Sequence, residues 1–138
     1  MRNRKSLDPD VLFREAKKAQ KNAHAPYSKH KIGAALRTAN GRIFSGCNVE
    51  NASYGGTVCA ERVAVFKAVS EGLKGPITDI CVISSQKDPW PPCGFCRQVL
   101  AEFATENTRI FLANPRGITK MFTLGELFPE SFTPTHLK

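Results

Sequence analysis

The sequence predicts a single α/β domain over residues 1–138, with a mixed sheet of about five strands covered by helices on both faces. A length of 138 residues and a mass of 15.2 kDa fit one domain. Hydrophobic residues make up 41% and charged residues 23%, which is ordinary for a globular protein. Apolar strand-like runs alternate with helix-like segments in the order α-β-β-α-β-α-β-β-α, the pattern of a sheet between helices.

One helix and two strands are predicted in the first fifty residues. Asp8 is a good N-cap and Pro9 suits the first helical position, so a helix starts here and runs to about residue 22. Its inner face carries Leu12, Ala16, Ala19 and Ala23. A strand follows over 32–36, and a second over 42–45 continues toward residue 49. Asn40-Gly41 between them is a hairpin turn signal.

The second half is predicted to hold three helices and three strands. Thr57 can cap a helix that ends near Gly72, and the apolar run 79–83 suits a buried central strand. A proline-rich turn over 88–92 leads into a helix over 93–104. Strands are expected over 109–113 and 118–122. Thr123 and Glu126 form a capping box that starts a short helix before Pro129.

Charge and hydropathy exclude several classes of protein. No apolar run approaches the roughly 20 residues of a membrane helix, and no apolar segment follows the basic start, as a secretory signal requires. We therefore expect a cytoplasmic protein with no membrane association. The net charge is +8, and residues 1–31 hold nine basic and three acidic residues. We interpret this excess as a solvated helix face and do not expect a nucleic-acid partner.

The five cysteines point to a metal site rather than to disulfides, because their number is odd and no export signal precedes them. Cys59 lies near one predicted helix start, and Cys93 and Cys96 lie at another, 34 positions further on. Two strand-to-helix corners of one sheet can meet at a point. Three thiolates there would bind one Zn²⁺ per chain with one position open, which is the catalytic pattern. Cys47 and Cys81 fall on predicted strands and are expected in the core.

Glu61 is the candidate catalytic residue, because it lies two residues beyond a ligand without being one. A carboxylate there can take a proton from zinc-activated water and pass it to a ring nitrogen, while hydroxide attacks an amino-bearing ring carbon. Three thiolates leave the zinc centre with a net charge near −1. Arg62 follows Glu61 and Arg97 follows Cys96, so both are expected to donate hydrogen bonds to the sulfurs. Of the two, Arg62 is the first candidate for this role.

Three segments together resemble the small homotetrameric zinc-dependent cytidine deaminases. They are Asn48-Val-Glu-Asn-Ala-Ser-Tyr54, Cys59-Ala-Glu-Arg62 and Pro92-Cys-Gly-Phe-Cys-Arg-Gln98. The likeness covers nearly the whole chain. It implies the three-layer α/β/α fold of that family. It also implies hydrolytic deamination of cytidine and 2′-deoxycytidine to the uridine products, in pyrimidine salvage, with zinc hydroxide attacking C4 and Glu61 as proton shuttle.

The resemblance also implies roles for residues around the metal. Asn48 and Glu50 resemble the pair that holds the ribose hydroxyls, and the backbone at Ala60 would read the Watson–Crick edge of cytosine with Glu61. Tyr54 and Phe132 resemble residues that reach a neighbouring subunit's pocket, which implies a homotetramer.

Two departures from the family pattern bear on the pocket. His30 stands where the family usually has a Phe that packs on the pyrimidine, and Phe95 stands where it has a small residue. One alternative is therefore a deaminase of a modified cytosine nucleoside or of a blasticidin-type antibiotic, although Asn48 and Glu50 favour an ordinary nucleoside. The other is a zinc-containing nucleic-acid-binding module, for which the sequence nominates no fourth ligand.

Overall fold

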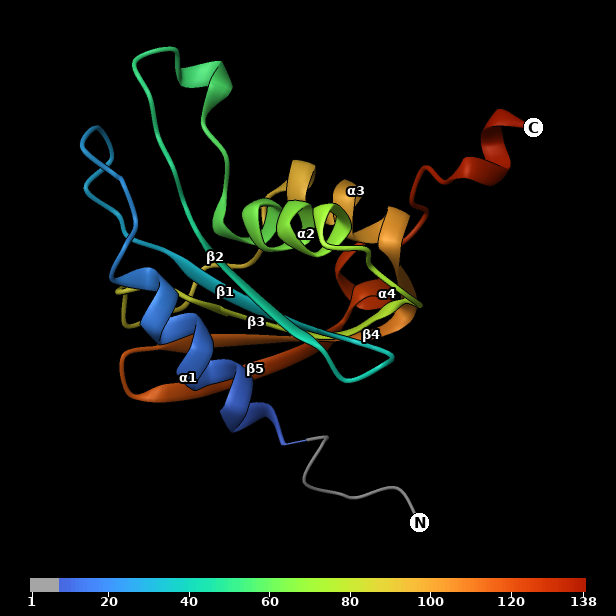
Figure 1. The fold of residues 1–138 in the computed structure, drawn as a ribbon, viewed down its shortest axis with the longest axis horizontal. Helices are drawn as coiled ribbons and strands as arrows, with labels where there is room; N and C mark the ends of the chain where they lie inside the picture. Colours follow the sequence, from blue (N-terminus) through green and yellow to red (C-terminus); the bar gives the residue numbers. More distant parts are fainter. Residues whose placement is uncertain (1–7) are drawn as a thin grey trace.

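A computed structural model describes residues 8–138 and arranges them in three layers, with a sheet between helices (Figure 1). Arg2, Arg4 and Lys5, part of the basic N-terminal excess, lie outside the described residues. The helices are α1 (Pro9–Gln20), α2 (Ala60–Ser70), α3 (Gly94–Phe103) and α4 (Leu124–Leu127). The strands are β1 (Gly33–Thr38), β2 (Ile43–Cys47), β3 (Ile77–Ile83), β4 (Ala104–Asn114) and β5 (Gly117–Thr123). Two short 3₁₀ turns, η2 (Tyr54–Gly56) and η3 (Pro134–Leu137), complete the order.

The sheet is mixed and five-stranded, in the order β2-β1-β3-β4-β5, which confirms the predicted fold class. Strands β3 and β4 run parallel, joined by α3, while every other neighbouring pair is antiparallel. Because β3 and β4 need a crossover connection, the segment before α3 is carried over the end of the sheet. That crossover brings the start of α3 beside the start of α2.

Each face of the sheet packs against its own set of helices. Helix α1 covers one face through Leu12 and Ala16, which pack on Ala35, Cys81 and Phe111. Helices α2, α3 and α4 cover the other face, where the core contains Ala64, Leu100 and Leu124 with Leu36, Ile80 and Ile110 (Figure 1). No helix in residues 8–138 is long and apolar enough to cross a membrane.

Helix α2 lies unusually close to the sheet. Gly46 of β2 faces it, and a Cβ added there would lie 2.6 Å from the backbone nitrogen of Ala64 and 2.8 Å from the oxygen of Ala60. Only a glycine permits this approach. The first turn of α2 is therefore positioned by direct contact with the sheet.

Several boundaries differ from the predictions for local reasons. Helix α2 is capped by Cys59 and not by Thr57, whose carbonyl instead accepts a hydrogen bond from Arg62. Strand β4 starts at residue 104 and not at 109, because the Thr108 hydroxyl bonds to the oxygen of Ile77 and ties this segment to β3. Beyond β2, Val49 forms only isolated bridges, to His24 and Val58.

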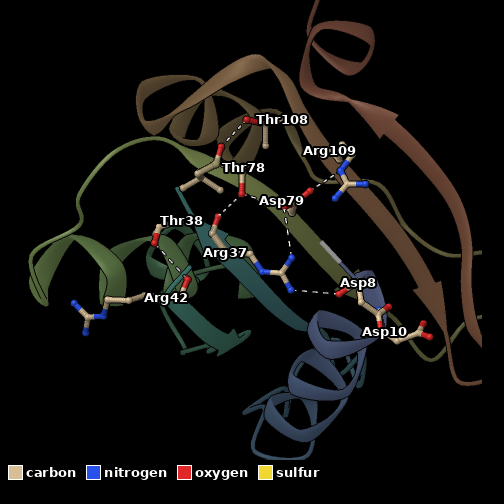
Figure 2. Close-up of polar contacts among 10 residues, drawn as sticks. Asp8, Asp10, Arg37, Thr38, Arg42, Thr78, Asp79, Thr108 and Arg109 are labelled. Atoms are coloured by element: carbon tan, nitrogen blue, oxygen red, sulfur yellow. Dashed lines mark hydrogen bonds and ion pairs between the residues drawn. The ribbon is translucent and has the colours of Figure 1, made fainter. Parts of the chain in front are cut away.

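An ionic row crosses β1, β3 and β4, with two buried members, Arg37 and Asp79, and the partly exposed Arg109 (Figure 2). Asp79 of β3 is register partner to Arg37 of β1 and to Arg109 of β4. Its carboxylate accepts a 2.6 Å hydrogen bond from Arg109 Nε and lies 4.0 Å from Arg37 Nη1. Arg37 also donates to the backbone oxygen of Asp8, the N-cap of α1. The row therefore fastens the first helix to the middle of the sheet.

Candidate metal centre and active site

The three predicted cysteine ligands lie together at the starts of α2 and α3. Cys59 is the N-cap of α2 and Cys93 the N-cap of α3, with Cys96 buried in the first turn of α3. The Sγ atoms of Cys59 and Cys93 are 3.8 Å apart, and those of Cys93 and Cys96 are 3.6 Å apart. All three sulfurs lie within 4.8 Å of one another. The positive ends of both helix dipoles therefore face the cluster, which favours thiolates.

These distances fit a zinc ion and exclude a disulfide. Zinc–sulfur bonds of about 2.3 Å at tetrahedral angles place thiolates about 3.8 Å apart, whereas a disulfide requires about 2.05 Å. All five cysteines are free thiols. The three thiolates would supply three of the four ligands that zinc usually takes, which would leave one position for a water molecule or substrate.

The thiols of Cys59 and Cys96 have pKa values shifted in opposite directions. A hydrogen bond from Cys96 Sγ and another from Arg62 lower the pKa of Cys59 to about 5, although burial opposes this. The pKa of Cys96 is raised, because its proton is held by Cys59 and its side chain is buried. Outside the cluster, burial raises the pKa of Cys81 to about 12, as expected of a core thiol.

Glu61 lies in the first turn of α2, only 4% exposed, and lines the same cavity as Cys59 and Cys93. Burial, and then the charge of Cys59, raises the pKa of its carboxyl group to about 7. A carboxyl group with such a pKa can both accept and release a proton near neutrality, which is the requirement for a general acid–base.

The two candidate arginines have different partners. Arg62 donates through Nη2 to Cys59 Sγ at 3.4 Å, as predicted for charge compensation. Arg97 instead donates through Nε to the oxygen of Pro92 at 2.8 Å, and through Nη1 to the oxygen of Leu127. These two bonds link the turn before α3 to the end of α4, and neither is made to a sulfur. The prediction that Arg97 bonds to the thiolates is therefore corrected.

Phe95 covers the outer side of Arg62 and does not line the cavity. Its ring centre lies 5.5 Å from the Arg62 guanidinium carbon, a cation–π arrangement, and the side chain is 76% exposed. The expectation that Phe95 alters the shape of the pocket is therefore wrong. Phe95 instead contacts Arg62, the arginine beside the metal site.

A cavity of about 270 Å³ opens beside the cysteine cluster and collects most of the predicted site residues. From the predictions it includes His30, Asn48, Glu50, Cys59, Ala60, Glu61 and Cys93. Sequence reasoning did not assign Ser28, Ile32, Thr57, Val82, Trp90 and Pro91, which also line it.

Asn48 and Glu50 lie at one end of the cavity, where both bind the segment 27–32. The Asn48 amide donates to the oxygen of His30 and accepts from the nitrogen of Ile32, each at 2.8 Å. Glu50 accepts hydrogen bonds from the backbone nitrogens of Tyr27 and Ser28 and from the Ser28 hydroxyl. The bond from the Ser28 hydroxyl is the largest cause holding the pKa of Glu50 below its usual 4.5.

His30 lies in the cavity wall beside Trp90. Their ring centres are 4.6 Å apart with a tilt of 59°, and His30 Nδ1 lies 3.4 Å from Gln86 Nε2. Trp90, three residues before a metal ligand, could have been suspected from that spacing. Its pairing with His30 could not, because the two positions are 60 residues apart in sequence and meet only in the fold.

Tyr54 and Phe132 do not enter this cavity. Tyr54 is 73% exposed and lies over a neighbouring hollow lined also by Tyr27, Ser28, Glu50 and Thr57. Phe132 is 53% exposed, and its ring stacks on His136 at 5.3 Å. Both side chains are thus on the surface of the single chain.

Comparisons with known proteins agree with this site. A family model described as the cytidine and deoxycytidylate deaminase zinc-binding region matches residues 8–112. The cytidine deaminase of Halalkalibacterium halodurans is 46% identical over 127 residues, covering 92% of this chain and 96% of that protein. That of Sporosarcina psychrophila is 42% identical over 131 residues, covering 95% and 96%. The crystal structure of cytidine deaminase from Burkholderia pseudomallei has a TM-score of 0.85 at 42% identity, covering 91% of this chain and 99% of that one.

The fold and the three-thiol site define a zinc-dependent deaminase. Within that class, the chain belongs to the family of the cytidine and deoxycytidylate deaminases. The prediction of zinc as cofactor is confirmed by the family match and by the sulfur geometry.

Proposed function

We propose that this protein deaminates cytidine and 2′-deoxycytidine hydrolytically, giving uridine or 2′-deoxyuridine and ammonia. The observation that carries this proposal is one cavity that joins a three-thiol metal site to a buried carboxyl group with a pKa raised to about 7. The relatives named cytidine deaminase, similar over more than nine-tenths of the chain, support the same substrate.

Cys59, Cys93 and Cys96 would hold the zinc, which when bound supplies a Lewis acid that activates water at neutral pH. Glu61 moves the protons. Its carboxylate accepts one from the attacking water, and its acid form donates one to N3 of the cytosine ring. The water oxygen bonds to C4, and Glu61 then carries the second proton from the resulting C4 hydroxyl group to the amino group. The C4–N bond breaks, so that ammonia leaves and the carbonyl of uracil forms. A group with a pKa near the working pH suits both directions of transfer.

The remaining cavity residues would bind and orient the nucleoside. We assign the sugar hydroxyls to Asn48 and Glu50, the Watson–Crick edge to the backbone at Ala60, and one face of the base to His30. Arg62 draws charge from Cys59 through its hydrogen bond, which offsets the excess negative charge of three thiolates.

Self-association as a homotetramer is part of the proposal. Large apolar side chains are exposed on the single chain, among them Tyr54, Phe66, Phe95 and Phe132. Burying them between subunits would remove apolar surface from water. Tyr54 lies beside Glu50 at the edge of the site, so a neighbouring chain packed there would help to complete the sugar end. We also propose a cytoplasmic location, since five free thiols suit a reducing compartment.

The proposal is tested by following cytidine absorbance with purified protein of measured zinc content. Wild-type protein should convert cytidine to uridine, and Cys93→Ser should lose zinc and activity together. Full zinc occupancy in Cys93→Ser would contradict the assigned ligands. A zinc-loaded wild type that leaves cytidine and deoxycytidine unchanged would contradict the function.

A further inference from the structure

Ser28 is the point at which the sugar end and the base wall of the cavity are joined. Its hydroxyl donates to Glu50 Oε2 at 2.5 Å and accepts from the backbone nitrogen of His30 at 3.1 Å. One hydroxyl thus connects the carboxylate assigned to the sugar with the residue assigned to the base. Nothing in the sequence patterns or in the proposed reaction assigns a role to Ser28.

The hydrogen bonds of Glu50 leave room for one more partner on a particular oxygen. A carboxylate offers about four acceptor positions, two on each oxygen. Oε1 accepts from the nitrogens of Tyr27 and Ser28, at 3.1 and 3.0 Å, and is filled. Oε2 accepts from the Ser28 hydroxyl and retains one position. The oxygen available to a substrate hydroxyl is therefore the one that Ser28 holds.

The opposite end of the same segment is held by Asn48. Its amide bonds to the oxygen of His30 and the nitrogen of Ile32. His30 is therefore fixed on its nitrogen side by Ser28 and on its carbonyl side by Asn48. Asn48 and Glu50 are buried, at 7% and 8% exposed, whereas Ser28 is itself exposed, so its hydroxyl holds the network together at the solvent-facing side of the cavity.

We propose that Ser28 is a positioning residue for the substrate. It orients Glu50 Oε2 toward the 3′-hydroxyl of the nucleoside, and it couples that contact to the placement of His30. The inference rests on the proposed function, which assigns the sugar hydroxyls to Glu50. It adds that recognition of the sugar depends on a side chain from the segment before β1.

The test compares cytidine with 3′-deoxycytidine, which lacks only the hydroxyl in question. Steady-state kinetics are measured for the zinc-loaded wild type, Ser28→Ala, Ser28→Thr and Ser85→Ala. Ser85→Ala is the matched control, since Ser85 is exposed and lies in the loop after β3. Zinc content and thermal unfolding are recorded for each variant.

For Ser28→Ala we expect KM for cytidine to rise about tenfold while kcat changes less than threefold. A tenfold loss corresponds to about 1.4 kcal/mol of binding. KM for 3′-deoxycytidine should change far less, so that the preference for cytidine over 3′-deoxycytidine in kcat/KM falls about tenfold. Ser28→Thr keeps the hydroxyl and should restore most of that preference, and Ser85→Ala should match wild type.

Equal losses for both nucleosides, or no loss for either, would overturn the role of Ser28. Should Ser28→Ala bind zinc poorly or unfold early, Ser28→Cys decides, because it keeps the shape and weakens the donor. An unchanged cytidine preference in Ser28→Cys would likewise overturn the inference. Failure of the proposed function is seen separately, as a wild type inactive on both nucleosides, and it would remove this inference as well.

Discussion

Replacing Gly46 by Ala should displace the metal site although residue 46 lies outside the cavity. Gly46 is on β2, directly under the first turns of α2, and α2 begins at Cys59 and carries Glu61. The added methyl group would meet the backbone of Ala60 and Ala64, which cannot move aside as a flexible side chain could. The whole start of the helix must therefore shift.

The size of that shift follows from the contact distances. The new Cβ would lie 2.6 Å from the nitrogen of Ala64, whereas ordinary contact begins at 3.4 Å, so α2 must retreat by about 0.8 Å. A displacement of about 1 Å at reacting groups can cost on the order of 100-fold in rate. Overpacking of this kind also costs about 1–3 kcal/mol in stability. We expect kcat/KM for cytidine to fall by about 30- to 100-fold.

The assay is cytidine turnover per folded, zinc-loaded molecule, with folding measured by urea unfolding and zinc by metal analysis. Gly55→Ala is the control, because nothing lies within 4 Å of a Cβ placed there. It should behave as wild type. If Gly46→Ala retains more than half of the wild-type turnover per folded molecule, the close contact of α2 with β2 does not position the site.

Three further predictions concern the ionic row, the cavity wall and the arginines. Asp79→Asn should lower the free energy of unfolding by about 3 kcal/mol, since it leaves Arg37 buried without its carboxylate; a loss below about 1 kcal/mol in urea unfolding would refute this. Trp90→Ala should raise KM for cytidine several-fold with little change in kcat, because the His30 ring loses its packing partner; an unchanged KM would show that Trp90 does not support the base wall. Arg62→Gln should release zinc to a chelator faster than wild type, whereas Arg97→Gln should release it at the wild-type rate, because only Arg62 bonds to a thiolate. Equal release rates in the two variants would contradict that distinction.

The features that could be predicted from the sequence depend on a few adjacent residues or on the spacing between motifs. The Asp8-Pro9 start, the hairpin after β1 and the Thr123 capping box are each set by a few adjacent residues, and the structure contains all three. The cysteine cluster was predictable because two helix starts at the end of one sheet converge, and Glu61 follows Cys59 by a fixed two residues.

What could not be predicted depends on contacts between distant segments. Arg97 adjoins a predicted ligand in sequence, yet its guanidinium is directed by the carbonyl of Leu127, 30 residues away. Nothing in the local sequence around Ser28 indicates that its hydroxyl bonds to Glu50, which lies 22 residues further along the chain. The early start of β4 depends on Thr108 finding the oxygen of Ile77 across the sheet. Such hydrogen bonds leave no periodic trace in the sequence.

The most direct test of the account is cytidine turnover by Glu61→Gln at full zinc occupancy. The Gln side chain keeps the size and burial of Glu61 but carries no transferable proton, so the metal and the fold should remain. We predict that the variant binds one zinc per chain, unfolds within about 1 kcal/mol of wild type, and shows a kcat lower by about 10³ or more. A zinc-loaded Glu61→Gln protein with near-normal kcat would contradict the central claim that this buried carboxyl group moves the protons of the reaction.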